Sequence, residues 1–147
     1  MSEINHTPTK PNLSTAQHIG RIILGAFLIF TGIGHLTFLR TEFLAQVPTW
    51  LPMNADLVVL LSGAVEIILG ASLIFLSKYR TQVGWIVALF FVLVFPGNIA
   101  QLVEHRDAFG LNSDLARCIR LPFQPLIIIL TLWSTGAWKA WRLRVSK

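Results

Sequence analysis

The sequence has few charged residues and almost no cysteine. Asp, Glu, Lys and Arg make up 13% of its 147 residues, whereas about a quarter is usual for a soluble domain. The single cysteine, Cys118, excludes an internal disulfide, a CxxC pair and a cysteine-based metal cluster. Apolar residues are abundant instead, because 54% of the chain is hydrophobic and the mean hydropathy is +0.64. These values indicate a membrane protein of one or at most two domains.

Four long apolar segments lie between the charged residues. A helix needs about 20 mostly apolar residues to cross the roughly 30 Å hydrocarbon core of a bilayer. The apolar runs are continuous rather than alternating, which favours helices over barrel strands. The sequence therefore predicts an all-α membrane protein, an antiparallel bundle of four transmembrane helices over 18–141, between a polar tail at 1–17 and a basic tail at 142–147. We expect the spans at about 19–39, 57–77, 81–103 and 121–140.

The distribution of basic residues predicts the orientation. The net charge of +5 does not indicate nucleic acid, because the bases lie at the ends of apolar runs rather than along one polar face. Eight Lys and Arg residues lie on the side of the two termini: Lys10, Arg21, Lys78, Arg80, Lys139, Arg142, Arg144 and Lys147. The opposite side has four: Arg40, Arg106, Arg117 and Arg120. The positive-inside rule then predicts that both termini are cytoplasmic.

Polar residues inside the spans are candidates for a binding site. Glu66 follows Asp56 by ten residues, so it lies about 15 Å deep in its helix. A carboxyl group there costs at least about 2.5 kcal/mol unless it is protonated or paired, and such residues are functional by default. The other polar residues lie toward the outer ends of their spans. We predict a pocket that opens outward, with Arg120 within reach of Glu66. Its predicted residues are His35, Glu66, Asn98, Gln101, Arg120 and Gln124.

These residue types also suit simpler structural roles. Asn98, Gln101 and Gln124 can bond neighbouring helices, and Arg120 can anchor a helix end at the interface. Glycine-rich faces of the first two spans, which also carry His35 and Glu66, predict that these spans pack closely. Spacing predicts no metal site and no haem site. The sequence contains no self-contained catalytic or redox centre, so its catalytic residues are unknown and enzyme activity stays open.

Four short motifs resemble the DoxX-like family of small bacterial four-helix membrane proteins. The resemblance runs from about Arg21 to about Trp133, through RIILGAFLIFTGIGHL, SGAVEIILG, FPGNIAQ and RLPFQ. The positions that carry it are His35, Glu66, Pro96, Asn98, Arg120 and Gln124. The resemblance implies a bacterial cytoplasmic membrane. The wider family includes subunits linked to thiosulfate:quinone oxidoreductases and membrane redox complexes, and it is similar to animal chaperones that assist acetylcholine-receptor assembly.

Three kinds of function follow as expectations. In the first, the pocket binds a quinone-like or other amphipathic molecule, with no covalent cofactor. Glu66 and His35 would bond its polar head, and its ring or tail would lie near Phe30, Phe95 and Phe123. Membrane lipid is an expected partner, and redox activity would need a partner membrane subunit or a homodimer. The alternative is an assembly factor or chaperone without catalytic activity that uses segments 41–55 and 104–120. A transporter is a third reading.

Overall fold

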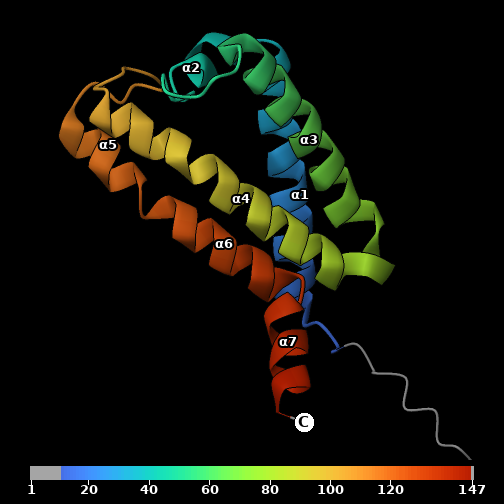
Figure 1. Ribbon diagram of the computed structural model, residues 1–147. Helices are drawn as coiled ribbons and strands as arrows, with labels where there is room; N and C mark the ends of the chain where they lie inside the picture. Colours follow the sequence, from blue (N-terminus) through green and yellow to red (C-terminus); the bar gives the residue numbers. More distant parts are fainter. Residues whose placement is uncertain (1–10, 147) are drawn as a thin grey trace, which may run out of the picture.

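The regular elements of the computed structural model, which describes residues 11–146, are all helices (Figure 1). They are α1 (Thr15–Leu36), α2 (Arg40–Leu44), α3 (Ala55–Phe75), the 3-10 turn η1 (Ser77–Tyr79), α4 (Arg80–Val103), α5 (Asp114–Arg120), α6 (Phe123–Ser134) and α7 (Ala137–Val145). Four stretches among these residues are long and apolar enough to cross a membrane. The predicted all-α class is thus confirmed for the described residues. The predicted tail at 1–17 lies mostly outside them.

Capping side chains set the helix starts. The Ser14 hydroxyl accepts from the backbone N–H of Gln17, and the Gln17 side chain accepts from the Ser14 N–H. This capping box starts α1 at Thr15, before the predicted residue 19. The Asn54 side chain accepts from the N–H groups of Asp56 and Leu57, which starts α3 at Ala55 rather than at 57. Polar side chains next to an apolar run therefore lengthen its helix.

Helices α1 and α3 pack against each other through glycines. A Cβ atom at Gly70 would lie 2.5 Å from the carbonyl oxygen of Gly25, and one at Gly63 would lie 2.6 Å from the His35 Cβ. Only glycine allows the two backbones to approach this closely. The close contact expected from the small residues of the first two spans is present, and it brings His35 and Glu66 together.

Helix α4 packs against α6, and the two helix pairs diverge toward α2 and α5 (Figure 1). Where the pairs converge, near η1 and the start of α7, the apolar side chains form the core. It consists of Leu24, Leu28, Leu69, Leu73, Val83, Val87 and Phe91. We call these two ends the α2 end and the α7 end. The packing leaves space between the helix pairs at the α2 end.

The fourth predicted span is not one continuous helix. Instead of a single helix over 121–140, α6 ends at Ser134 and α7 begins at Ala137. Gly136 between them has φ 70°, a left-handed conformation that glycine adopts without steric cost. Helix α7 consequently takes a new direction (Figure 1). Charge counting missed this break because the apolar run continues through it.

Candidate functional site

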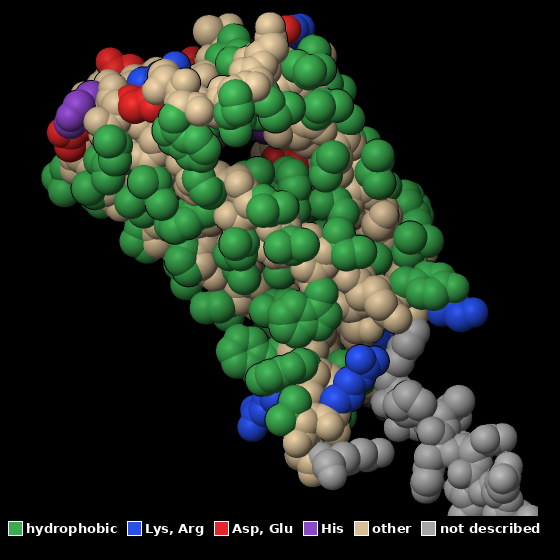
Figure 2. Space-filling view, viewed as in Figure 1, with side chains coloured by type: hydrophobic (Ala, Val, Ile, Leu, Met, Phe, Trp, Pro, Cys, Tyr) green, Lys and Arg blue, Asp and Glu red, His purple; other side chains and the backbone are tan. Residues whose placement is uncertain are grey.

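A cavity of about 840 Å³ lies between the two helix pairs at the α2 end. Helices α1, α3, α4 and α6 form its walls, and residues of segment 39–51, which includes α2, cover it. The hollow is visible from outside, with carboxylate atoms inside it (Figure 2). Most of its lining is apolar, so the few polar side chains determine which groups a ligand can present.

The structure brings the predicted site residues to this cavity. Five line it directly: His35, Glu66, Asn98, Arg120 and Gln124. Gln101, the sixth, lies behind the wall, where its side chain is 1% exposed. Its Oε1 accepts a hydrogen bond of 3.3 Å from Arg120 Nη1. Gln101 therefore positions Arg120 rather than facing the cavity itself.

Glu66, His35 and Thr31 form an acid–histidine cluster on the α1–α3 side. Thr31 Oγ1 donates to Glu66 Oε2 at 2.7 Å. His35 Nδ1 lies 3.1 Å from the carbonyl oxygen of Val59. Since a carbonyl can only accept, Nδ1 carries the hydrogen, and Nε2 of a neutral ring is an acceptor. Nε2 is buried without a hydrogen bond, 3.6 Å from Glu66 Oε1. Phe43 stacks on the ring, with centroids 3.5 Å apart.

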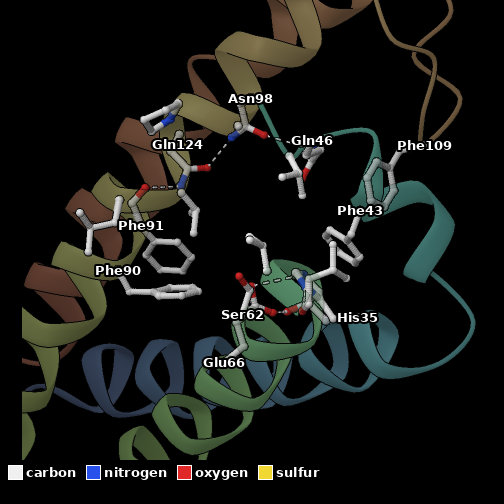
Figure 3. Close-up of a pocket in the computed structure, with 18 of the residues that line it drawn as sticks. His35, Phe43, Gln46, Ser62, Glu66, Phe90, Phe91, Asn98, Phe109 and Gln124 are labelled. Carbon is white, nitrogen blue, oxygen red and sulfur yellow. Dashed lines mark hydrogen bonds and ion pairs between the residues drawn. The ribbon is translucent and has the colours of Figure 1, made fainter. Parts of the chain in front are cut away.

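Amides and Arg120 form a second polar cluster across the cavity. Asn98 Nδ2 donates to Gln124 Oε1 at 3.0 Å, and Gln124 Nε2 donates to the carbonyl of Phe91 at 2.8 Å. The Gln46 amide lies within hydrogen-bonding distance of Asn98 and Arg120. Figure 3 shows these amides facing Glu66 and His35 across the open space. We call them, with Arg120, the amide cluster.

The reach of Arg120 allows a direct or a water-mediated link to Glu66, and the structure shows no direct hydrogen bond between the two side chains. The Arg120 guanidinium donates to Gln101 and lies 5.1 Å from the ring centroid of Phe109. Among residues 11–146, it forms no ion pair with a carboxylate. The guanidinium thus belongs to the amide cluster, and a cationic group without a counter-ion lines the cavity opposite a carboxyl group.

The aromatic lining differs from the expectation. Phe123 lines the cavity, but Phe30 and Phe95 do not. Phe30 is 56% exposed on the outside of α1, where its ring lies 5.8 Å from that of Phe38. Helical rotation explains this difference, since Thr31 lies on the inward face and the neighbouring Phe30 is turned about 100° away from it around the helix. The other aromatic rings at the cavity are Phe27, Phe43, Trp50, Phe90, Phe91 and Phe109.

Sequence reasoning missed several site residues. Thr31 has a signal in the sequence, because it precedes His35 by four residues and so shares its helix face. Phe43, Gln46 and Phe109 have no such signal. Phe43 comes from the short helix α2, and Gln46 and Phe109 come from irregular segments. The approach of all three to the cavity depends on contacts between loops.

Those contacts hold segment 39–51 over the cavity. Arg106 Nη1 donates to the carbonyls of Val47 at 2.7 Å and Ala45 at 3.1 Å. The Thr49 hydroxyl donates to Glu104 Oε1 at 2.8 Å, and this bond lowers the pKa of Glu104 below its usual value. The N–H of Phe109 donates to the Glu42 carboxylate. The cover is therefore joined to the loop between α4 and α5.

The fold and site define an all-helical protein with four apolar helical stretches and an amphipathic cavity. The sequence profile of a family described as "Domain of unknown function (DUF8561)" matches residues 24–135. The chain belongs to this family. The matched range includes every residue that lines the cavity. No curated protein and no solved structure matches the chain.

Proposed function

We propose that the chain is an integral protein of a bacterial cytoplasmic membrane, with its four apolar stretches crossing as an antiparallel bundle and both termini cytoplasmic. Large apolar side chains cover the outer faces of these helices, including Ile23, Ile68 and Leu93, each at least 63% exposed. Such surfaces suit lipid rather than water. Basic residues concentrate at the α7 end, as expected of a cytoplasmic side. The DoxX-like resemblance remains part of this proposal.

The cavity, in this proposal, binds a quinone-like amphipathic molecule that enters from the outer leaflet. The observation that carries the proposal is the pair of polar clusters on opposite sides of an apolar cavity. A 1,4-quinone has its two oxygens on opposite edges of a flat apolar ring. Its ring would lie near Phe43, Phe90 and Phe91, with an oxygen toward each cluster. The cavity volume of about 840 Å³ falls within the usual range for small-molecule sites.

The two clusters offer complementary hydrogen-bonding groups. Arg120 and the Asn98 amide can donate to a carbonyl oxygen. Across the cavity, His35 Nε2 and Glu66 Oε1 can accept from a hydroxyl group, such as that of a hydroquinone. Electron transfer needs a redox partner, because the chain supplies no thiol pair or haem ligand set. We therefore propose binding within a membrane redox complex rather than self-contained catalysis.

Ligand analysis of the purified protein tests this proposal. Native mass spectrometry and solvent extraction identify what co-purifies, and titration with a short-tailed 1,4-benzoquinone in its reduced, hydroquinone form measures its affinity, because only the hydroxyl groups of that form can donate to Glu66 and His35. We expect Glu66→Ala to weaken binding about tenfold, since hydrogen bonds to charged groups contribute about 1.5–3 kcal/mol. The matched control is Ser72→Ala on the same helix, because the Ser72 hydroxyl donates to the carbonyl of Ile68 and Ser72 does not line the cavity.

Absence of quinone binding, or equal binding by Glu66→Ala and wild type, would contradict the proposal. A membrane protein that co-purifies with Glu66→Ala and is lost when the 104–120 loop is altered would support the assembly factor instead. Arg106 donates to segment 39–51, and Glu104 accepts from Thr49 of that segment. Altering the 104–120 loop therefore also changes segment 39–51, which a client protein would contact.

A further inference from the structure

A second hollow, of about 780 Å³, lies at the α7 end, far along the helices from the first cavity. The start of α1, the second half of α6 and one face of α7 form it. Its lining residues are Ser14, Gln17, Ile129, Leu132, Trp133, Gly136, Trp138, Lys139, Arg142, Leu143 and Ser146. The break at Gly136 creates this space, since it turns α7 so that one of its faces meets the start of α1.

Two cationic side chains line the hollow without a counter-ion. Lys139 and Arg142 are three residues apart on α7, so they share a face. Among residues 11–146, neither forms an ion pair or a hydrogen bond through its side chain. Gln17 fixes the opposite wall, because its Nε2 donates to the carbonyl of Trp133 at 2.6 Å. The hollow therefore presents two uncompensated positive charges against a fixed wall.

An apolar surface continues from these charges along α6. Ile129 is 52% exposed and Trp133 is 44% exposed, and both line the hollow. Trp138, 47% exposed, lies beside Lys139. Tryptophan favours the boundary between headgroups and acyl chains. Cations on one side and apolar side chains on the other match a molecule with an anionic head and a hydrocarbon tail.

We propose that this hollow binds the headgroup of an anionic glycerophospholipid. Lys139 and Arg142 contact its phosphate, and an acyl chain lies along Ile129 and Trp133. The charges favour phosphatidylglycerol over phosphatidylcholine, because the choline group brings its own positive charge to the two cations. The site is separate from the quinone cavity, and its occupancy does not depend on that cavity.

Lipid binding in neutral detergent micelles tests the site. Native mass spectrometry measures the retention of added phosphatidylglycerol and phosphatidylcholine, where no charged membrane surface attracts the protein. We expect wild type to retain phosphatidylglycerol preferentially. The double variant Lys139→Gln/Arg142→Gln should lose about 25-fold in affinity, because each basic group near an anionic lipid contributes about a fivefold effect. The exchange Lys139→Arg/Arg142→Lys keeps both charges and should stay within about threefold of wild type.

The matched control is Arg144→Gln, which removes a charge from α7 outside the hollow. It should bind as wild type does. A loss of about fivefold, as expected for the removal of any one basic group, would overturn the proposal, since binding would then follow total charge. Equal retention of the two lipids by wild type would also overturn it. Displacement of the lipid by millimolar inorganic phosphate would indicate a site for a water-soluble phosphate compound and would overturn the lipid assignment.

Discussion

The acid–histidine cluster depends on a hydroxyl group. Thr31 is the hydrogen-bond donor to Glu66 Oε2, and valine has nearly the same shape without the oxygen. We expect Thr31→Val to destabilise the protein by about 1–3 kcal/mol, the cost of leaving a buried polar atom without its partner. It should also weaken quinone binding. Thermal unfolding in detergent and quinone titration measure both effects. Thr37→Val is the control, because Thr37 is exposed and its hydroxyl donates to the carbonyl of Ile33 in the last turn of α1. An equal effect there would contradict the role of Thr31.

Arg21 has a structural role that its position in the sequence does not indicate. By its position in the sequence, Arg21 is a basic residue at the predicted cytoplasmic boundary of the first span. In the structure, however, Arg21 is only 3% exposed. Its guanidinium donates to the carbonyl of Leu73 and, at 3.2 Å, to Ser77 Oγ. It thereby satisfies a carbonyl in the last turn of α3, which has no partner within that helix.

Replacing Arg21 tests this role. We expect Arg21→Met, which keeps an unbranched apolar stem, to destabilise the protein by about 1.5–3 kcal/mol, in the range for hydrogen bonds to charged groups. Chemical denaturation in detergent micelles measures the change. Arg144→Met on exposed α7 should change stability by less than about 0.5 kcal/mol. Similar losses in both variants would indicate a general effect of net charge.

At the scale of elements, the contact between α1 and α3 leaves no space for side chains larger than glycine at several positions. An added methyl group at Gly63 would meet His35 Cβ at 2.6 Å and the backbone of Gly32 at 2.8 Å. We expect Gly63→Ala to cost about 1–3 kcal/mol and to displace His35, so that ligand binding falls as well. At Gly20, the nearest atom to an added Cβ lies 3.3 Å away on the Trp133 ring. Gly20→Ala should therefore be tolerated, as unfolding measurements would show.

The cover of the cavity should loosen in acid. The Thr49 hydroxyl bonds the Glu104 carboxylate and lowers the pKa of Glu104 from its usual 4.5. A carboxyl group with a lowered pKa stabilises the fold above its unfolded value and loses this contribution as pH falls through the folded value. We expect Thr49→Val to be less stable than wild type at pH 6 and equally stable well below pH 4. Denaturation at both pH values measures this, and a difference that persists in acid would contradict it.

Sequence patterns predicted the helices better than their connections. Charge-free runs with polar flanks identify long helices, because burial of apolar side chains dominates there. The same runs gave no sign of the break at Gly136, since a single glycine is common inside membrane helices. Depth along each helix placed Glu66, Asn98 and Gln124 in the outer half of the bundle, and the glycine faces indicated that α1 packs against α3. The partners of Arg120 depend on where Gln46 and Phe109 lie in irregular segments, which no periodicity describes.

At the scale of the whole molecule, the two ends differ in chemistry. The α2 end holds the first cavity, Glu42, Glu104 and Asp114, whereas the α7 end holds Lys139 and Arg142. If the helices cross a membrane, this asymmetry places the first cavity toward the outer leaflet and the basic hollow toward the inner leaflet, where anionic lipid headgroups attract basic residues. With this orientation, the first cavity faces the outer leaflet, from which the quinone would enter, and the second hollow faces the anionic lipids of the inner leaflet.

Cysteine labelling tests this orientation with few changes, because Cys118 is the only cysteine in the chain. In a Cys118→Ser background, we introduce Asn112→Cys at the α2 end or Ser146→Cys at the α7 end, both exposed positions. A membrane-impermeant maleimide should label the first variant in intact cells and the second only after permeabilisation. The positive-inside rule requires this result, since eight of the twelve Lys and Arg residues lie on the side of the termini. Labelling of Ser146→Cys in intact cells would reverse the orientation and place the first cavity on the cytoplasmic side.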